Sequence, residues 1–343
     1  MKIALDATYS VGDEPSGIGV YSREMLCGFA RAHPEVQFEF CYRPHAYRAA
    51  RADSLPPNAR RRLLAAPFSP HGVDLFHGLN QRLPRKRFAR SVATFHDLFV
   101  LTGEYSTPEF RERFTGQARD AASRADAIIA VSEFTKRQVV DVLGVEASRV
   151  YVVHHGTTRW PAPAGVLRER FILSVGSIQK RKNTARLVEA FEGVDKSWRL
   201  VLAGGEGYGA AEIRERIRRS CASERVMVTG YVSKAELAAW YARASVFAFP
   251  SLDEGFGMPV LEAMSAGIPV VTSNRSALPE VAGDAALLVD PEETAALTEA
   301  LRDLTRNSDL REKLSAKGLK RAGLFTWEQA VQQTWAVYGR VLR

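Results

Sequence analysis

Two glutamates flank a glycine-rich turn in the stretch PSLDEGFGMPVLEAMSAGIPVV, residues 250–271. Glu254 precedes the turn, and Glu262 lies about one turn into the helix expected to follow it. Gly255 and Gly257 would let a ligand approach the backbone closely. Amides at a helix start favour a phosphate, and carboxylates can accept hydrogen bonds from sugar hydroxyls. The stretch therefore predicts a site for a ligand with a phosphate in its middle and hydroxyl-rich groups at both ends.

A second candidate site follows the apolar run RFILSVG. Lys180, Arg181 and Lys182 stand there at a turn from strand to helix. Three adjacent cations repel one another unless an anion lies between them, and such turns are the usual ligand edge of an α/β sheet. The turn predicts an anion site, with an exposed basic loop as the alternative.

The first half of the chain offers two further candidates. Gly17 and Gly19 begin an expected helix in the pattern G-x-G-x-x-S, which lacks the third glycine of a dinucleotide site. The next strand also ends without an acid, so a nicotinamide enzyme is disfavoured. His96 ends a strand beside Asp97, where it could face a cleft or be a structural histidine.

Short apolar runs that alternate with helical patterns must position these residues. This alternation predicts parallel sheets with crossover helices. The expected strands span residues 2–8, 36–42, 73–78, 91–97, 126–132, 149–156, 170–176, 198–204, 225–231, 245–251, 268–273 and 286–290. The proline-rich segment 159–165 reads as a linker. We therefore expect two doubly wound α/β domains, with residues 1–160 in the first and 166–326 in the second.

The last helix is expected to rejoin the first domain. Apolar residues recur there every three or four positions, at Trp327, Val331, Trp335, Tyr338 and Val341. This stripe must pack on something, and helices near 293–306 and 309–321 are expected to cover the second sheet. Residues 327–343 are therefore assigned to the first domain.

Composition narrows the classes of protein. The chain has 343 residues, a net charge of +8 and three cysteines. We expect reduced thiols in a cytoplasmic protein, because the cysteines are too few for a disulfide framework and no secretion signal or membrane span is visible. The basic stretches 60–62 and 82–90 favour an anionic partner. They lack interleaved aromatic residues or a known module, so nucleic acid is disfavoured.

With these motifs assembled, the chain resembles glycosyltransferase family 4, whose members have the GT-B fold. The resemblance rests on segments in the family's order, including SGIGVYSREML, ATFHDL, VGSIQKRKNTARLVEAF, LAGGEG and EGFGMPVLEAMSAGIPVVTSN. It implies two Rossmann-like domains facing a central cleft, with the N-terminal domain binding the acceptor and the C-terminal domain binding a nucleotide-sugar donor.

The resemblance also implies roles for single residues. Glu254 would contact the donor sugar and Glu262 the ribose, while His96 would lie near the reacting sugar as a catalytic-site residue with Lys182 and Glu254. The remaining donor-binding positions are Gly17, Gly19, Arg181, Tyr231, Val232, Gly255, Phe256, Gly257, Met258, Pro259 and Val260. Where the common family pattern carries an arginine, this chain has Ser177, and Arg181 is expected to supply the missing cation.

The implied reaction is transfer of a hexose with retention of anomeric configuration. We expect no metal cofactor, because cations and helix amides can stabilise the leaving diphosphate and no D-x-D triplet is present. GDP-mannose is the favoured donor and a glycan or lipid-linked glycan the favoured acceptor, with residues 82–90 against an anionic membrane. A glycogen- or sucrose-synthase-like enzyme and a basic nucleic-acid-binding protein are the alternatives.

Overall fold

The computed structural model describes residues 1–12, 16–160 and 165–343, which form two compact units. Unit 1 comprises residues 1–102, 107–156 and 326–343, and unit 2 comprises residues 103–106 and 157–325. The chain thus passes into unit 2 after Gly156, earlier than the boundary expected at residue 160. Of the linker expected at 159–165, residues 161–164 lie outside the described residues.

Unit 1 is built on a seven-stranded parallel sheet with the order β3-β2-β1-β4-β5-β6-β7. Its strands are β1 (Lys2–Asp6), β2 (Gln37–Tyr42), β3 (Ala59–Leu63), β4 (Leu75–Gly78), β5 (Ser91–Phe95), β6 (Ala127–Ala130) and β7 (Val150–Val152). The sequence did not predict β3, whose residues ARRRL form the edge of the sheet. An edge strand tolerates this much charge because one of its sides meets solvent.

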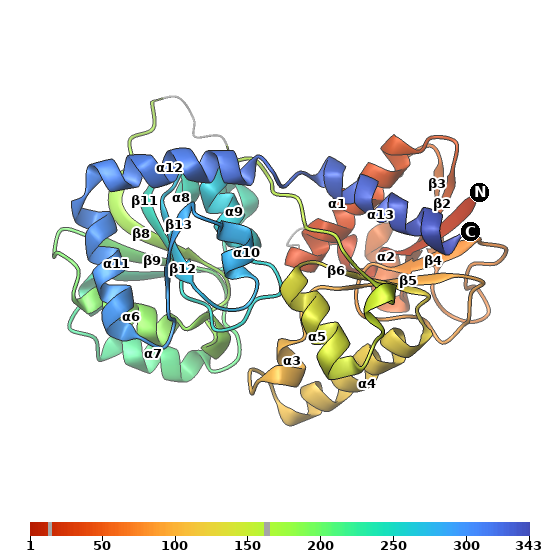
Figure 1. The fold of residues 1–343 in the computed structure, drawn as a ribbon, viewed down its shortest axis with the longest axis horizontal. Helices are drawn as coiled ribbons and strands as arrows, with labels where there is room; N and C mark the ends of the chain where they lie inside the picture. Colours follow the sequence, from red (N-terminus) through yellow and green to blue (C-terminus); the bar gives the residue numbers. More distant parts are fainter. Residues whose placement is uncertain (13–15, 161–164) are drawn as a thin grey trace. The chain divides into compact units, whose positions relative to one another are not determined.

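Helices cover both faces of this sheet (Figure 1). They are η1 (Thr8–Ser10), α1 (Gly17–Ala32), α2 (Pro44–Ala50), α3 (Phe99–Thr102), α4 (Pro108–Arg124), α5 (Glu133–Leu143), η2 (Ala147–Arg149) and α13 (Trp327–Val341). Buried side chains of α4 and α5 pack on Ala93 and Phe95 of β5. On the other face, α13 packs against α1, where a Cβ added at Gly28 would lie 2.5 Å from Val331 Cγ2. The expected return of the last helix to the first domain is confirmed.

Unit 2 has a six-stranded parallel sheet with the order β10-β9-β8-β11-β12-β13. Its strands are β8 (Glu169–Val175), β9 (Arg199–Ala203), β10 (Val226–Gly230), β11 (Ala244–Phe249), β12 (Val270–Ser273) and β13 (Ala286–Val289). All six strands were expected from their apolar runs. The strand order reverses at the β8–β11 pair, which is where ligands bind in open α/β sheets.

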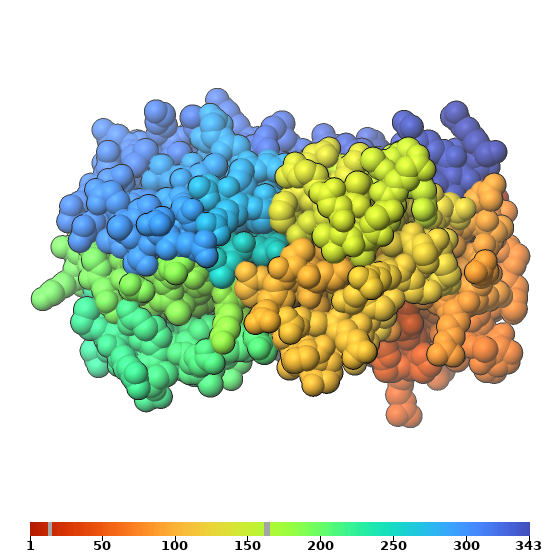
Figure 2. Space-filling model, turned by 60° about the horizontal axis from the view of Figure 1, so that its bottom comes forward, coloured from red at the N-terminus to blue at the C-terminus, as the bar shows by residue number. Residues whose placement is uncertain are grey.

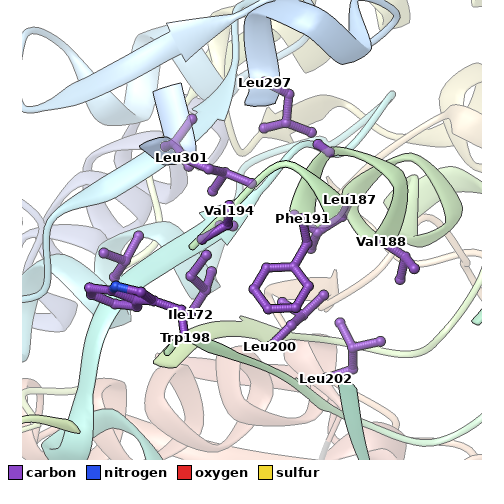
Figure 3. Packing of buried hydrophobic residues seen from close by; sticks show 14 of the residues in the cluster. Ile172, Leu187, Val188, Phe191, Val194, Trp198, Leu200, Leu202, Leu297 and Leu301 are labelled. Carbon is purple, nitrogen blue, oxygen red and sulfur yellow. The ribbon is translucent and has the colours of Figure 1, made fainter. Parts of the chain in front are cut away.

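The helices of unit 2 also lie on both faces of its sheet (Figure 1). They are η3 (Lys180–Lys182), α6 (Thr184–Glu192), α7 (Ala210–Arg218), η4 (Ser223–Arg225), α8 (Lys234–Arg243), α9 (Met258–Ser265), α10 (Leu278–Ala282), α11 (Thr294–Arg306) and α12 (Ser308–Ala322). Figure 3 shows the core under α6 and α11, where Phe191 and Leu301 pack on Ile172 and Leu200 of the sheet. This packing fixes the strands whose carboxyl ends carry the candidate site. No helix among residues 1–12, 16–160 and 165–343 is long and apolar enough to span a membrane.

Candidate functional site

A buried cluster of charges in unit 2 joins the loops that follow β8 and β11. Arg181 Nη1 lies 2.9 Å, and Lys182 Nζ 2.6 Å, from the same Oε1 of Glu254. Ser251 donates a third hydrogen bond to this oxygen at 2.6 Å. Arg181 also donates to the backbone carbonyl of Asp253. The sequence placed the cations and the acid at separate strand ends, and the adjacency of β8 and β11 brings them together.

The anion between these cations is a side chain of the chain itself. Burial alone would raise the pKa of Glu254, but the charges of Arg181 and Lys182 and the hydrogen bonds from Lys182 and Ser251 lower it to about 2. The cations were expected to need a bound anion, and Glu254 supplies one. Lys180 is held apart, because its ammonium pairs with Glu212 at 2.9 Å.

Helix α9 begins directly beside this cluster. Gly257 precedes its first residue with φ +107°, a conformation that favours glycine, and a Cβ there would lie 2.6 Å from Leu278 Cδ2. Met258 begins the helix, and Pro259 occupies its first turn as expected. The amides of residues 255–258 therefore belong to a turn whose shape is fixed by packing, and this turn directly follows Glu254, the partner of Arg181 and Lys182.

Glu262 lies one turn further along α9 in a different environment. Tyr241 of α8 donates its phenol hydrogen to Glu262 Oε2 at 2.9 Å. Burial raises the pKa of Glu262, while this hydrogen bond and the charge of Lys234 oppose the increase. The sequence had not marked Tyr241, because a tyrosine inside an amphipathic helix usually signals only packing.

The remaining unit 2 positions lie at the same edge of the sheet. Tyr231 and Val232 follow β10 and immediately precede the N-cap of α8, with Tyr231 exposed. Phe256 is buried, and its ring packs edge-on against Phe325 with centroids 5.9 Å apart. Ser177, in the place of the family arginine, is exposed.

The candidates of unit 1 lie at the carboxyl edge of the other sheet. Gly17 is the first residue of α1, and the amide of Gly19 donates to the Oγ of the N-cap Ser16 at 3.3 Å. His96 follows β5, and its Nε2 lies 2.9 Å from the carbonyl of Leu79. Its Nδ1 lies 3.3 Å from Nε2 of His155. Burial lowers the pKa of His96 to about 4, so its ring is uncharged at neutral pH.

Beneath His96 lies a buried polar chain that the sequence did not reveal. The Tyr338 hydroxyl lies 2.6 Å from His77 Nδ1, and His77 Nε2 lies 2.8 Å from Thr94 Oγ1. Thr94 in turn contacts the Tyr21 hydroxyl at 3.0 Å, and the edge of the Tyr21 ring meets His96. Tyr338 of α13 is thus linked to the residues around His96 by hydrogen bonds. The sequence did not predict this link, because Tyr338 fits the apolar stripe of α13.

Sequence comparisons identify the chain. The family described as Glycosyltransferase Family 4 matches residues 16–158, and Glycosyl transferases group 1 matches residues 159–321. O-antigen chain mannosyltransferase B of Escherichia coli is 31% identical over 281 residues, which cover 77% of this chain and 74% of that protein. The chain belongs to glycosyltransferase family 4. This glycosyltransferase is therefore an enzyme of the hexosyltransferase class, as the sequence predicted.

Other relatives match smaller shares of their own length. D-inositol 3-phosphate glycosyltransferase of Nocardioides sp. is 31% identical, over 69% of this glycosyltransferase and 58% of that protein. Serotype-specific mannosyltransferase WbdA of Escherichia coli is 28% identical, and this chain matches only 34% of its length.

Solved structures confirm the GT-B fold. Sucrose-phosphate synthase from Thermosynechococcus elongatus superposes with a TM-score of 0.79 over 99% of this glycosyltransferase and 98% of that chain, at 22% identity. HepE of Anabaena, solved with UDP-glucose, gives a TM-score of 0.78 over 99% and 100% of the two chains, at 16% identity. At such identities the superpositions show the fold alone.

Metal-ligating side chains are spread through the two units. Among the residues that the structure describes, no group of three or more histidines, cysteines or acids gathers as a metal site would require.

Proposed function

We propose that this glycosyltransferase moves a hexose from a nucleoside diphosphate sugar to a glycan or lipid-linked glycan, with retention of anomeric configuration. The observation that carries the proposal is the convergence of Arg181 and Lys182 on Glu254, beside the first turn of α9, at the strand-order reversal of unit 2. A diphosphate at this edge would meet two cations and the helix amides. The carboxylates of Glu254 and Glu262 would take the sugar and ribose hydroxyls.

The chemistry follows from where charge develops. As the acceptor oxygen bonds to the anomeric carbon, the bond from that carbon to the phosphate oxygen breaks, and its electron pair stays on the leaving diphosphate. Lys182, Arg181 and the amides of residues 255–258 stabilise this charge, each donor contributing about 2–4 kcal/mol. The departing phosphate accepts the proton of the acceptor hydroxyl. These donors take the place of a metal ion.

Glu254 is unsuited to act as a covalent nucleophile. Its Oε1 accepts hydrogen bonds from Lys182 and Ser251 and pairs with Arg181, and its pKa is lowered to about 2. Such a carboxylate donates electron density weakly. We assign it instead to orienting the cations and contacting the sugar. His96 is assigned no proton transfer, because both of its ring nitrogens have partners within unit 1.

We propose GDP-mannose as the donor, and the names of the relatives support its sugar. The names of O-antigen chain mannosyltransferase B, WbdA and MMP alpha-(1->4)-mannosyltransferase all specify mannose transfer. The second candidate is a sucrose-synthase-like enzyme with a glucosyl donor. HepE was solved with UDP-glucose, and sucrose-phosphate synthase shares the fold.

A thermal-shift panel tests the donor site. The chain is heated with GDP, UDP, TDP and ADP and their common sugar conjugates, in the presence of EDTA. Stabilisation by one nucleotide that persists in EDTA and is lost in Glu262→Ala and Lys182→Ala is expected. The absence of any shift in the unaltered protein would overturn the proposal.

We further propose that unit 1 rests on an anionic membrane surface at the cytoplasmic face. Residues 43–90 contain eleven lysines and arginines and two acids, a net charge of +9, whereas the whole chain carries +8. The positive charge of the chain is therefore concentrated in this one segment, which is orange in Figure 2. Phe68 is 63% exposed, and around a hollow beside it lie Arg61, Arg62 and His71. Exposed cations and an aromatic side chain are features of peripheral membrane contact.

Two double variants distinguish binding through this surface from a nonspecific effect of the net charge of the chain. Arg85 and Arg87 are exposed, whereas Lys86 is held by the carbonyl of Pro70 at 2.6 Å. Replacing both arginines with alanine should weaken binding to phosphatidylglycerol vesicles about thirtyfold, since each cation near such a surface contributes about 1 kcal/mol. The control Lys313→Ala/Lys320→Ala removes the same charge from exposed positions of unit 2. Equal sedimentation of the two double variants would contradict the placement.

A further inference from the structure

Helix α8 supports Glu262 from two positions on one face. The helix starts with a capping box, in which Ser233 and Glu236 exchange hydrogen bonds of 2.8 and 3.3 Å. A fixed start fixes the rotation of the helix. Lys234 and Tyr241 are seven residues apart, a spacing that places both on the same side of a helix. Both act on Glu262, Lys234 through its charge and Tyr241 through its hydroxyl.

The position of the Tyr241 hydroxyl is determined by packing. The side chain is fully buried. Its ring meets Trp160 at a centroid distance of 5.4 Å and Phe247 at 6.1 Å. Arg168 donates to the backbone carbonyl of Tyr241. A ring clamped in this way can deliver its hydrogen bond in only one direction, which is toward Oε2 of Glu262.

The two glutamates of α9 and its preceding loop are therefore held in opposite ways. Glu254 accepts three donors on one oxygen, two of them charged. Glu262 has one donor, Tyr241, among the residues that the structure describes. Its Oε1 is left to accept hydrogen bonds from a ligand, and a carboxylate oxygen can accept two. A vicinal diol suits this arrangement, because its two hydroxyls can both donate to the Oε1 of Glu262 while Tyr241 occupies Oε2.

We propose that Tyr241 and Lys234 are positioning residues that hold the Glu262 carboxylate toward the two ribose hydroxyls of the donor nucleoside, an inference that rests on the proposed function. The same helix follows Tyr231 and Val232 directly, so α8 connects the segment expected near the base with the carboxylate expected on the ribose. Substitutions on this face should affect recognition of the nucleoside and leave the diphosphate contacts of Arg181 and Lys182 intact.

The test compares nucleotides with and without ribose hydroxyls. Calorimetric titration uses GDP, UDP and ADP, each beside its 2′,3′-dideoxy form, with the unaltered chain, Tyr241→Phe and Lys234→Met. Tyr241→Phe should reduce the preference for the ribonucleotide about tenfold, the usual effect of one lost hydrogen bond to a charged group. The donor KM should rise by a similar factor with kcat unchanged. Tyr151→Phe, in unit 1, is the matched control.

Nucleotide affinity measured over a range of pH distinguishes a specific effect on Glu262 from a general loss of packing around α8. Because Tyr241 and Lys234 hold the pKa of Glu262 down, their removal raises it, and affinity should begin to fall at a higher pH as the solution is acidified. Lys234 is exposed, so Lys234→Met tests this shift even if Tyr241→Phe fails to fold.

The outcomes separate the two proposals. Ribonucleotide preference in the unaltered chain that persists unchanged in Tyr241→Phe and Lys234→Met would overturn the role of α8 and leave the donor site standing. Failure of the unaltered chain to bind any of the three nucleotides would overturn the proposed function, and the inference with it.

Discussion

Replacing Glu254 with glutamine should destabilise unit 2 while leaving its shape unchanged. The substitution removes the negative charge that Arg181 and Lys182 share at 2.9 and 2.6 Å. A pKa lowered from 4.5 to about 2 means that the folded protein favours the ionised carboxylate by about 3 kcal/mol. The cost of leaving buried partners unpaired is about 3–5 kcal/mol, which agrees in size. For a unit of this length, about 3 kcal/mol corresponds to a melting temperature lower by about 6–12 °C.

A nucleoside diphosphate should restore much of this loss. In the unaltered chain Glu254 already balances the two cations, whereas in Glu254→Gln the diphosphate would bring back the missing anion. Differential scanning calorimetry with and without GDP and UDP should therefore show a larger nucleotide-induced rise in melting temperature for the variant. The nucleotide that stabilises the unaltered chain is the one to compare.

The difference in stability between the unaltered chain and Glu254→Gln should disappear at low pH. A carboxyl with a lowered pKa contributes stability that is complete above its unfolded pKa, near 4.5, and is lost as pH falls toward about 2. The gap between the unaltered chain and Glu254→Gln should therefore be full at pH 7 and shrink below pH 4.5.

Glu206→Gln is the matched control. Glu206 pairs with Arg214 at 2.5 Å in the same unit, but both side chains are largely exposed, and such pairs contribute at most about 1 kcal/mol. Equal melting temperatures for Glu254→Gln and Glu206→Gln, or no added effect of nucleotide on the former, would refute the reasoning.

Three further predictions concern the cations, the histidines and the last helix. Arg181→Ala should raise the donor KM roughly 30- to 1,000-fold, equivalent to about 2–4 kcal/mol, whereas an unchanged KM in steady-state kinetics would show that Arg181 does not replace the family arginine. Burial lowers the pKa of His77 to about 3 and that of His96 to about 4, so between pH 6.5 and 4 these histidines bind protons in the unfolded chain but not in the folded one. The free energy of unfolding in urea should therefore fall as the pH drops from 6.5 toward 4. The same pH dependence in a His77→Phe/His96→Phe variant would contradict this prediction. Tyr338→Phe leaves Nδ1 of His77 without its hydrogen-bond partner and should lower the unfolding free energy by about 1–3 kcal/mol in the same assay, whereas Tyr151→Phe should change it little. Equal losses for the two variants would show that the buried hydrogen-bonded chain does not contribute to stability.

Apolar runs predicted most of the fold because a parallel sheet covered on both faces needs continuous apolar strands. The exception was β3, an edge strand that needs little apolar surface, where Arg60 is exposed and Arg62 donates to Glu39 Oε1 at 3.0 Å. The sequence predicts a basic patch at residues 60–62, and the exposed arginines of β3 agree with that prediction. The period of the last helix predicted where it packs, and its contacts with α1 confirmed this.

The candidate site was less accessible to sequence reasoning. The types of Lys182 and Glu254 indicated an anion and a hydroxyl site, but only the adjacency of β8 and β11 shows that each satisfies the other. Likewise, nothing in the sequence of α8 distinguishes Tyr241 from a core residue, because its role depends on the direction of one hydroxyl. The hydrogen bonds of His96 required the positions of Leu79 and His155, which lie on other loops.

A crystal structure of the complex with the most stabilising nucleoside diphosphate would test the donor site most directly. We predict the diphosphate against Lys182, Arg181 and the amides of residues 255–258, with the ribose hydroxyls on Glu262. A nucleotide bound elsewhere on the chain, with the pairs of Glu254 undisturbed, would contradict the account.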